Sequence, residues 1–173
     1  MTGPQFYEAL VRAYISLGSN MGDGPAHLAE AGSHVAALPG VSVAAVSSLY
    51  RTEPQGRRDQ PWFVNQVLAL DCHGLTADTL LSALLSIENH MGRVRDPADR
   101  FGPRVIDLDL LLFSSEVRAE PRLTLPHPRL AERAFVLVPL REIAPDLMLP
   151  SGQRVKDLAR ALPHCVEGDR IFQ

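Results

Sequence analysis

Cysteine and histidine are sparse in this sequence, and neither is spaced like a metal or redox site. The chain has 2 cysteines and 6 histidines among 173 residues. Cys72 and Cys165 lie far apart, without the short spacing of a zinc or dithiol motif, which excludes a disulfide-stapled domain and indicates a reduced, cytoplasmic setting. The histidines are scattered without ligand spacing, so no zinc site is indicated.

Long apolar runs and an excess of one charge are also missing. No apolar stretch reaches membrane-spanning length and the N-terminus lacks a signal-peptide pattern, so we expect neither a membrane protein nor a secreted one. The net charge of −3 and the pI near 6.0 argue against binding to nucleic acid or to a membrane surface. Lys156 is the only lysine; the arginines suit bidentate phosphate contacts, although a GC-rich genome would produce the same bias.

The chain does contain enough apolar residues for a core. At 173 residues and 46% apolar, it fits one globular domain spanning residues 1–173. Residues 1–10 precede the first clear strand and are expected to form a loose N-terminal extension. No repeat, low-complexity tract or linker is visible, and we expect a monomer.

The order of expected elements indicates the fold class. Extended apolar runs predict strands at 14–17, 41–52, 62–70 and 105–113. Helical spacing predicts helices at 25–38 and at 76–91, the second with Thr76 as N-cap and Gly92 after its end. The order β-α-β-β-α-β predicts an α+β, ferredoxin-like fold, a mostly antiparallel sheet with helices packed on one face. Two further helices, at 135–143 and 155–162, are expected as C-terminal additions.

The strand at 105–113 carries two acids in an apolar setting. Alternation places on one face Val105, Asp107, Asp109, Leu111 and Phe113, and on the other Ile106, Leu108, Leu110 and Leu112. The branched apolar residues predict a central strand that is covered on both faces. The two carboxylates then lie about 6–7 Å apart, one pleat repeat. Such a pair is costly in apolar surroundings unless cations neutralise it.

An arginine-rich segment just upstream offers such cations. It is broken by Pro97, Gly102 and Pro103 and carries Arg93, Arg95, Arg100 and Arg104. Guanidinium groups match phosphate oxygens, and Mg²⁺ prefers carboxylates shared with substrate phosphates, so the pair and the loop together indicate a metal-plus-polyphosphate site. The alternatives are a structural Asp-x-Asp and a solvated arginine surface, but acids inside an apolar strand do not fit a solvated surface.

The stretch from Arg100 to Leu111, with Gly-Pro-Arg followed two residues later by Asp-x-Asp, resembles the signature of the 6-hydroxymethyl-7,8-dihydropterin pyrophosphokinase family. The resemblance extends over about residues 12–149. It includes a first strand that ends in Gly18-Ser19-Asn20, which by itself predicts only a turn. The family transfers the β,γ-diphosphoryl unit of ATP to the hydroxymethyl oxygen of the pterin and releases AMP.

The resemblance also implies roles for individual residues. Asp107 and Asp109 would bind two Mg²⁺ ions, and Arg93, Arg95 and Arg104 would act on the ATP phosphates as catalytic residues. Further nucleotide contacts are implied for Glu88, Phe101, Leu110, Arg122, Thr124, His127 and Arg133. The pterin pocket is implied to consist of Thr52, Pro54, Gln55, Phe63, Asn65 and Phe135.

Several alternatives remain at these positions. Phe63 and Phe135 would serve equally as core residues, whereas Asn65 in an apolar strand needs hydrogen-bond partners. His127 lies in a Pro-His-Pro turn that structure alone would explain. The polar loop at 53–61 and the arginine loop are expected to close over the substrates. Two other functions stay open: a metal-dependent phosphoryl or nucleotidyl transferase with another acceptor, and a non-catalytic ligand-binding domain.

Overall fold

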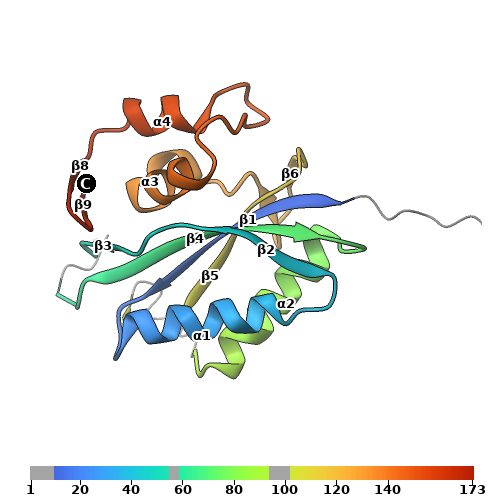
Figure 1. Cartoon of the computed structure of the whole chain (residues 1–173), viewed down its shortest axis with the longest axis horizontal. Helices are drawn as coiled ribbons and strands as arrows, with labels where there is room; N and C mark the ends of the chain where they lie inside the picture. The colour runs from blue at the N-terminus through green and yellow to red at the C-terminus, as the bar shows by residue number, and fades with distance from the viewer. Residues whose placement is uncertain (1–9, 55–58, 94–101) are drawn as a thin grey trace, which may run out of the picture.

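The computed structural model describes residues 10–54, 59–93 and 102–173 (Figure 1). The first part of the fold comprises β1 (Val11–Ser19), α1 (Gly24–Ala36), β2 (Val41–Val46), β3 (Tyr50–Thr52), β4 (Phe63–Cys72), α2 (Ala77–His90) and β5 (Asp107–Phe113). The second comprises β6 (Arg118–Ala119), β7 (Thr124–Leu125), the 3-10 helix η2 (Leu130–Glu132), α3 (Ala134–Ile143), α4 (Val155–Ala161), β8 (Cys165–Glu167) and β9 (Arg170–Phe172). Residues 1–9 lie outside the described ranges, so the loose extension stays a prediction.

The strand order confirms the predicted fold class. In the described residues the main sheet has the order β5-β1-β4-β3-β9-β8, with β2 also paired to β4. β1 runs antiparallel to β4 and β5, and β2 and β3 run antiparallel to β4. β4 therefore lies between β1 on one side and β2 and β3 on the other. This is the α+β, ferredoxin-like arrangement. The parallel pair of β3 and β9 is an addition to that arrangement.

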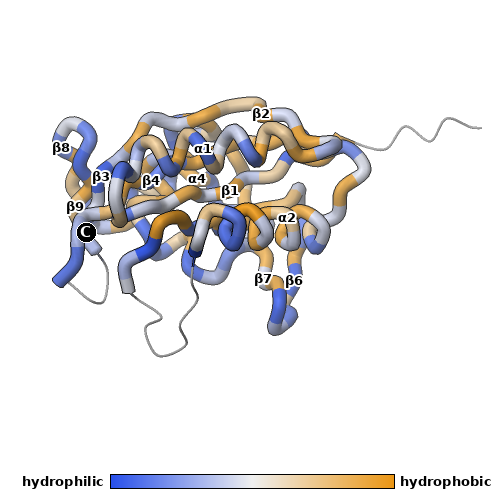
Figure 2. The backbone as a smooth tube through the Cα atoms, turned by 90° about the horizontal axis from the view of Figure 1, so that it is seen from below, coloured by the Kyte–Doolittle hydropathy of each residue, from blue (hydrophilic) through white to orange (hydrophobic). Residues whose placement is uncertain are grey.

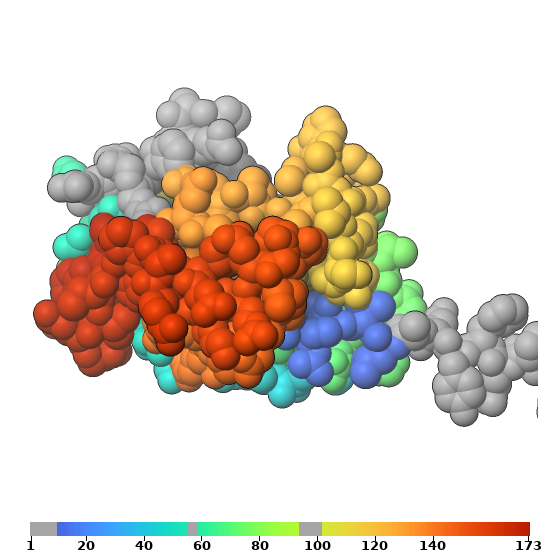
Figure 3. All heavy atoms as spheres, turned by 90° about the horizontal axis from the view of Figure 1, so that it is seen from above, coloured from blue at the N-terminus to red at the C-terminus, as the bar shows by residue number. Residues whose placement is uncertain are grey.

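Helices cover both faces of the sheet, which corrects the prediction of one covered face. α1 and α2 lie below the sheet and α3 and α4 above it (Figure 1). β4 explains why: Leu68 and Leu70 belong to the core below, and Val67 and Ala69 to the core above. Because both faces of β4 are apolar, the chain after residue 133 must fold back over the upper face to bury it. Figure 3 shows this upper layer in orange and red.

β5 is an edge strand of the main sheet and not the predicted central one, since β1 is its neighbour there. Other groups satisfy its outer edge. The Leu108 N–H donates to the Glu88 carboxylate at 2.7 Å, and the Leu111 carbonyl accepts from the His127 N–H at 2.8 Å. These two bonds occupy part of the outer hydrogen-bonding row of β5 and make it a poorer template for another strand.

The predicted alternation along β5 holds as far as Leu111. The register with β1 shifts between Tyr14 and Ile15, a β-bulge that leaves Leu111 as an extra residue. As a result, Leu112 lies in the upper core and Phe113 in the lower one, the reverse of the prediction. The acids keep their predicted shared face because they precede the bulge.

The strand predicted at 41–52 is two strands, β2 and β3. Between them Ser47 pairs with Val67, donating its N–H to the Val67 carbonyl and accepting the Val67 N–H on its hydroxyl, both at 3.0 Å. Glu142 of α3 then accepts from the Ser48 hydroxyl at 2.8 Å and from the Tyr50 hydroxyl at 2.9 Å. These contacts fix the break and set β3 against β4, with Thr52 opposite Phe63.

The helix ends follow the sequence signals closely. Thr76 and Thr79 form a capping box at the start of α2, and Gly92 follows its end with a φ of 83°, a left-handed conformation that glycine adopts easily. Asp23 caps α1, accepting from the Ala26 N–H at 3.1 Å. Within the described residues, no helix has both the length and the apolar character needed to cross a membrane.

Candidate active site

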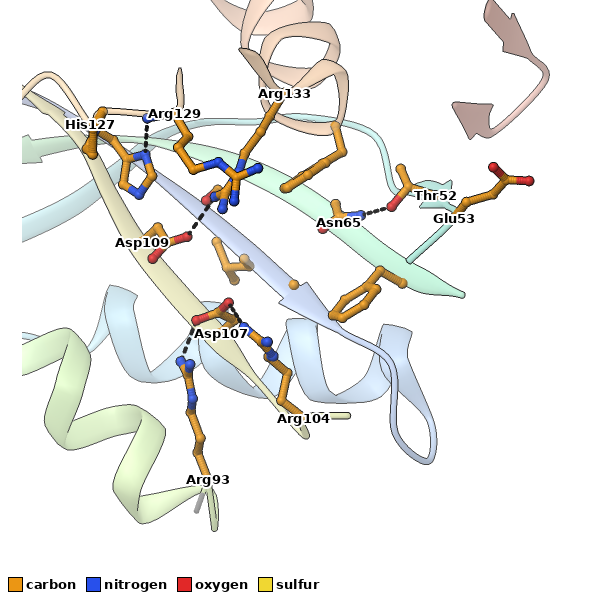
Figure 4. A pocket seen from close by; sticks show the side chains of 16 residues that line it. Thr52, Glu53, Asn65, Arg93, Arg104, Asp107, Asp109, His127, Arg129 and Arg133 are labelled. Carbon is orange, nitrogen blue, oxygen red and sulfur yellow. Dashed lines mark hydrogen bonds and ion pairs between the residues drawn. The ribbon is translucent and has the colours of Figure 1, made fainter. Parts of the chain in front are cut away.

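A pocket of about 630 Å³ opens between the ends of the central strands and the start of α3. Its lining residues come from β1, β3, β4, β5, α3, the segment that leads into α3, and the connection between α2 and β5 (Figure 4). Two ends can be distinguished. We call the part around Asp107, Asp109, Arg93, Arg104 and Arg133 the acid end. The part around Thr52, Asn65, Phe63 and Phe135 is the amide end.

Asp107 is paired with two arginines from opposite sides (Figure 4). Arg93 Nη1 donates to its Oδ1, and Arg104 Nη1 donates to its Oδ2 at 2.7 Å. Burial alone would raise the pKa of Asp107, but the charges of Arg93 and Arg104 outweigh burial and hold that pKa below its usual value. Asp107 is therefore ionised at neutral pH.

Asp109 follows on the same face of β5 in a different electrostatic setting. Its nearest cation is Arg133, with Nη1 at 3.7 Å from Oδ2. Burial, followed by the negative charge of Asp107, raises the pKa of Asp109 to about 6. The second acid thus lacks full neutralisation, and a further cation in the pocket would favour its charged form.

Glu88 organises the acid end from beneath. Its side chain is fully buried at the end of α2, at 0% exposure. The carboxylate accepts from Arg93 Nη1 and from the Leu108 N–H, so it ties the guanidinium that holds Asp107 to the strand carrying both acids. A buried carboxylate is tolerable only with such partners. Glu88 does not line the pocket, whereas the sequence predicted a nucleotide contact.

Arg133 and His127 face the acid end from the connection between β7 and α3. Arg133 Nε is buried and lacks a hydrogen-bond partner within the described part of the chain. Burial, then the Arg133 charge, lowers the pKa of His127 to about 4, so the ring is neutral at pH 7. Its Nδ1 accepts from the Arg129 N–H at 3.2 Å, which assigns the ring proton to Nε2. Both side chains therefore offer N–H donors suited to anionic oxygens.

The amide end is organised by a hydrogen bond between two neutral side chains. Asn65 is 5% exposed and donates from Nδ2 to the Thr52 hydroxyl at 2.7 Å (Figure 4). Gly18 of β1 faces it so closely that a Cβ there would lie 3.0 Å from Asn65 Oδ1. Phe63 and Phe135 line the same region, under the guanidinium groups of Arg104 and Arg133 at 5.9 and 5.3 Å from the ring centroids. The amide end can thus hold a flat polar ring.

Comparison with known proteins decides the family. The family model for 7,8-dihydro-6-hydroxymethylpterin-pyrophosphokinase matches residues 14–145. The chain belongs to this family. The 2-amino-4-hydroxy-6-hydroxymethyldihydropteridine pyrophosphokinase of Methylorubrum extorquens is 50% identical over 159 residues, which is 91% of this chain and 98% of that protein. The same-named protein of Pseudomonas aeruginosa is 46% identical over 152 residues, 88% and 92% of the two chains.

The fold is also similar to solved structures of much lower identity. A crystal structure of Plasmodium falciparum HPPK-DHPS, wild type with pteroate, aligns with a TM-score of 0.69 and 14% sequence identity, over 94% of this chain and 47% of that one. The family membership predicted from the Gly-Pro-Arg and Asp-x-Asp pattern is confirmed. The individual residue roles are not tested by these similarities and stay predictions.

Most of the predicted pyrophosphokinase residues meet in the pocket, but several do not. Those lining it are Arg93, Arg104, Asp107, Asp109, His127, Arg133, Thr52, Phe63, Asn65 and Phe135. The Leu110 side chain lies in the core below the sheet, and Pro54 is not among the lining residues. Arg95, Gln55 and Phe101 lie outside the described residues.

Arg122 and Thr124 lie on the β6–β7 hairpin, a separate two-stranded sheet beside α2 (Figure 2). Arg122 Nη2 donates to the Ser82 hydroxyl of α2 at 2.8 Å, and the Thr124 hydroxyl donates to the Glu120 carbonyl at 3.4 Å. In this arrangement neither side chain lines the pocket. Their predicted nucleotide contacts have no counterpart in its geometry.

Sequence reasoning missed Arg129, Glu53 and Asn20. The first two line the pocket. Asn20 accepts the Arg104 N–H at 2.8 Å and donates to the Pro61 carbonyl at 3.1 Å, so it joins the end of β1 to both loops that flank the site. The signal was available, because an asparagine that ends a buried strand needs partners in the fold.

The acids fit Mg²⁺ held jointly with a substrate. No described group of three or more His, Cys, Asp and Glu side chains is arranged as a metal cage. Mg²⁺ needs none, since it commonly takes one or two carboxylates and fills its octahedron with water and substrate phosphates. Asp109, which is paired only loosely and disfavoured as an uncompensated anion, has the chemistry of such a ligand.

Proposed function

We propose that this protein transfers the diphosphate group of ATP to 6-hydroxymethyl-7,8-dihydropterin in the presence of Mg²⁺ and releases AMP. The observation that carries this proposal is one pocket with two chemically different ends. A pair of acids with unmatched donors at one end suits a metal-bound polyphosphate. A buried amide and two phenylalanines that line the other end suit a flat heterocycle.

At the acid end, this chain's residues would bind and orient the phosphates. Arg133 Nε and His127 Nε2–H are the donors described above, and Arg93 and Arg104 are held at Asp107. Guanidinium groups bind phosphate oxygens bidentately and remain charged. Mg²⁺ on Asp107 and Asp109 would neutralise charge on the transferred group and orient it.

At the amide end, Asn65 and the two rings would hold the pterin. An amide has two donor hydrogens and an acceptor oxygen, and the bond to Thr52 uses one donor. The remaining donor and the oxygen match a pterin edge, which carries both kinds of group. Stacking on Phe63 and Phe135 would add about 0.5–1.5 kcal/mol per ring beyond burial.

The reaction needs positioning more than proton chemistry. The hydroxymethyl oxygen attacks the β-phosphorus, the bond from that phosphorus to the oxygen shared with the α-phosphate breaks, and AMP leaves while the hydroxyl proton passes to solvent. Holding both substrates in one pocket makes this an effectively unimolecular step. Phosphoryl transfer is catalysed chiefly by such positioning and by electrostatic stabilisation.

The test is product analysis with the purified chain. Incubation with ATP, MgCl₂ and 6-hydroxymethyl-7,8-dihydropterin should yield equal amounts of AMP and pterin diphosphate by mass spectrometry. Removal of Mg²⁺ with EDTA should stop the reaction, and restored MgCl₂ should recover it. Release of ADP or pyrophosphate, or no pterin product in any of these conditions, would overturn the proposal.

A further inference from the structure

The end of the described chain, residues 165–173, lies against three segments that carry pocket residues. We call it the β8–β9 hairpin. Figure 1 and Figure 2 both place it beside β3 at one end of the sheet. β9 runs parallel to β3, with Arg51 opposite Arg170 and Thr52 opposite Ile171, and the Arg51 N–H donates to the Asp169 carbonyl at 2.7 Å. The hairpin therefore supports the outer side of the strand that presents Thr52.

Gln173 satisfies the start of α3. Its Oε1 accepts the Ala134 N–H at 2.8 Å, and its Nε2 donates to the Glu132 carbonyl at 2.6 Å. The first N–H groups of a helix have no partners within the helix and need a cap. Arg133, the N-cap residue, makes no side-chain cap bond, so its side chain is left for the pocket while Gln173 does the capping.

Apolar contacts hold the hairpin in place. Ile171 is 2% exposed and packs in one cluster with Ala134 and Val138 of α3. Phe172 contacts Trp62 edge to face, with centroids 5.7 Å apart at 83°. Trp62 immediately precedes β4, whose first residue is Phe63. The hairpin thus touches the segments that bear Thr52, Phe63 and Phe135 together.

A second, much smaller cleft adjoins the amide end. Ile171 and Gln173 line it with Thr52, Glu53 and Phe135. No residue of the hairpin lines the main pocket itself. Its residues support the wall of the amide end from behind, without contacting the space that a substrate would fill.

We infer that the β8–β9 hairpin is a positioning element for the substrate pocket, in which Gln173 fixes the start of α3 and so the placement of Arg133 and Phe135. The inference rests on the proposed function, because it concerns how well the pocket holds the two substrates. Small displacements of positioning groups have large kinetic effects, since reacting atoms must be held in a near-attack geometry.

The first test replaces the capping side chain. Gln173→Ala removes both bonds to the start of α3 and should raise KM for the pterin roughly tenfold. The melting temperature should fall by only about 2–4 °C, as for the loss of one helix cap. Gln153→Ala is the matched control, an exposed glutamine whose replacement should leave KM unchanged. A lower melting temperature with an unaltered KM would mean a merely structural role and would overturn the inference.

A double-mutant cycle tests the route of the effect. If Gln173 acts through Phe135, Gln173→Ala should change KM much less in a Phe135→Leu background than in the wild type, because coupled residues are not additive. Equal effects in both backgrounds would contradict the inference. Turnover by the wild type separates the two proposals. If the wild type forms no pterin diphosphate, the proposed function is wrong. If the wild type turns over normally and Gln173→Ala has the same KM, only the inference about the hairpin is wrong.

A second variant uses a built-in probe. Trp62 is the single tryptophan of the chain, and its ring contacts Phe172. Phe172→Ala should change the Trp62 emission, reporting release of the hairpin, and should raise KM for the pterin in parallel. Altered emission with an unchanged KM would show that the pocket does not depend on the hairpin.

Discussion

Different interactions hold the side chains of the acid end and of the amide end in place. At the acid end, charges hold one another: Glu88 holds Arg93, and Arg93 and Arg104 hold Asp107. At the amide end, the Asn65–Thr52 bond joins neutral groups on adjacent strands, and β4 and β3 place them by backbone pairing. One end is a balance of charges and the other is a consequence of strand register.

This difference decides how each end responds to change. Removing one charge leaves its partners buried and unbalanced, a penalty of several kcal/mol in other proteins. Removing one neutral group costs about 1–3 kcal/mol, mainly through the partner that loses its bond. The paired charges of Glu88, Arg93 and Asp107 should therefore couple activity to stability, whereas the amide end should allow the two to vary separately.

The largest effect is expected at Asp109. Asp109→Asn should reduce kcat at least about 100-fold, because loss of a metal contribution of several kcal/mol acts at tenfold per 1.36 kcal/mol. The melting temperature without Mg²⁺ should stay level or rise, since burial disfavours the Asp109 anion. Steady-state assays and thermal melts check both parts.

Asp71→Asn is the matched control, an aspartate on β4 that pairs with Arg12 at 2.7 Å outside the pocket. It should retain full activity. An Asp109→Asn enzyme with near-normal AMP release would refute a role for this acid and weaken the contrast between the two ends.

At Glu88 we expect a smaller loss of activity than at Asp109, together with a loss of stability. Glu88→Gln keeps an acceptor for the Leu108 N–H but removes the charge that faces Arg93, so the free energy of unfolding should fall by about 3–5 kcal/mol. kcat/KM should fall as well, because Arg93 loses one of its two anchors. Urea unfolding and kinetics on the same samples check this, with Glu30→Gln on the exposed face of α1 as the control. A Glu88→Gln variant that loses stability but keeps its kcat/KM would contradict the expected coupling of stability and activity at the acid end.

The amide end should show the opposite separation. Thr52→Val removes the acceptor of the Asn65 amide and should raise KM for the pterin about 5- to 100-fold, through misorientation of that amide. KM for ATP should change less than twofold, and Thr52→Ser, which keeps the hydroxyl, should restore the wild-type value. Equal changes in both KM values would mean that the two ends are not independent.

The smallest effect is expected at Glu142, outside the pocket, and concerns how the melting temperature depends on pH. Hydrogen bonds from Ser48 and Tyr50 outweigh burial and lower the pKa of Glu142 below 4.5. A carboxylate with a depressed folded pKa stabilises the fold above its unfolded pKa, and that stabilisation is lost as the pH falls through the folded value. The melting temperature of Glu142→Gln should therefore be lower than that of the wild type at pH 7, and this difference should shrink below about pH 4.5. A difference that is constant from pH 7 to 3.5 would contradict it.

The sequence predicted what depends on local pattern and missed what depends on distant partners. The α2 boundaries followed from Thr76 and Gly92, which act within a few residues of the helix ends. β5 was misplaced as central because the groups that satisfy its edge, Glu88 and His127, are remote in the chain. The pairing of acids with arginines was predictable from spacing, but its arrangement around Glu88 was not.

The C-terminal hairpin shows the same limit more strongly. Its strands β8 and β9 have three residues each, too short for a reliable alternation pattern. Gln173 can cap α3 only because α3 begins at Ala134, and that start depends on how the upper layer packs. Arg122, for which the family resemblance implies a nucleotide contact, donates to Ser82 of α2 in this structure, and its role stays a prediction.

The bond from Leu108 to Glu88 has a consequence for how the protein behaves in concentrated solution. A bare outer row on β5 would be a template on which other chains could add strands and grow into insoluble assemblies. The buried Glu88 carboxylate occupies the Leu108 N–H of that row, on the strand that carries the acids. Variants that lose the carboxylate altogether, such as Glu88→Leu, should therefore precipitate more readily as well as react more slowly.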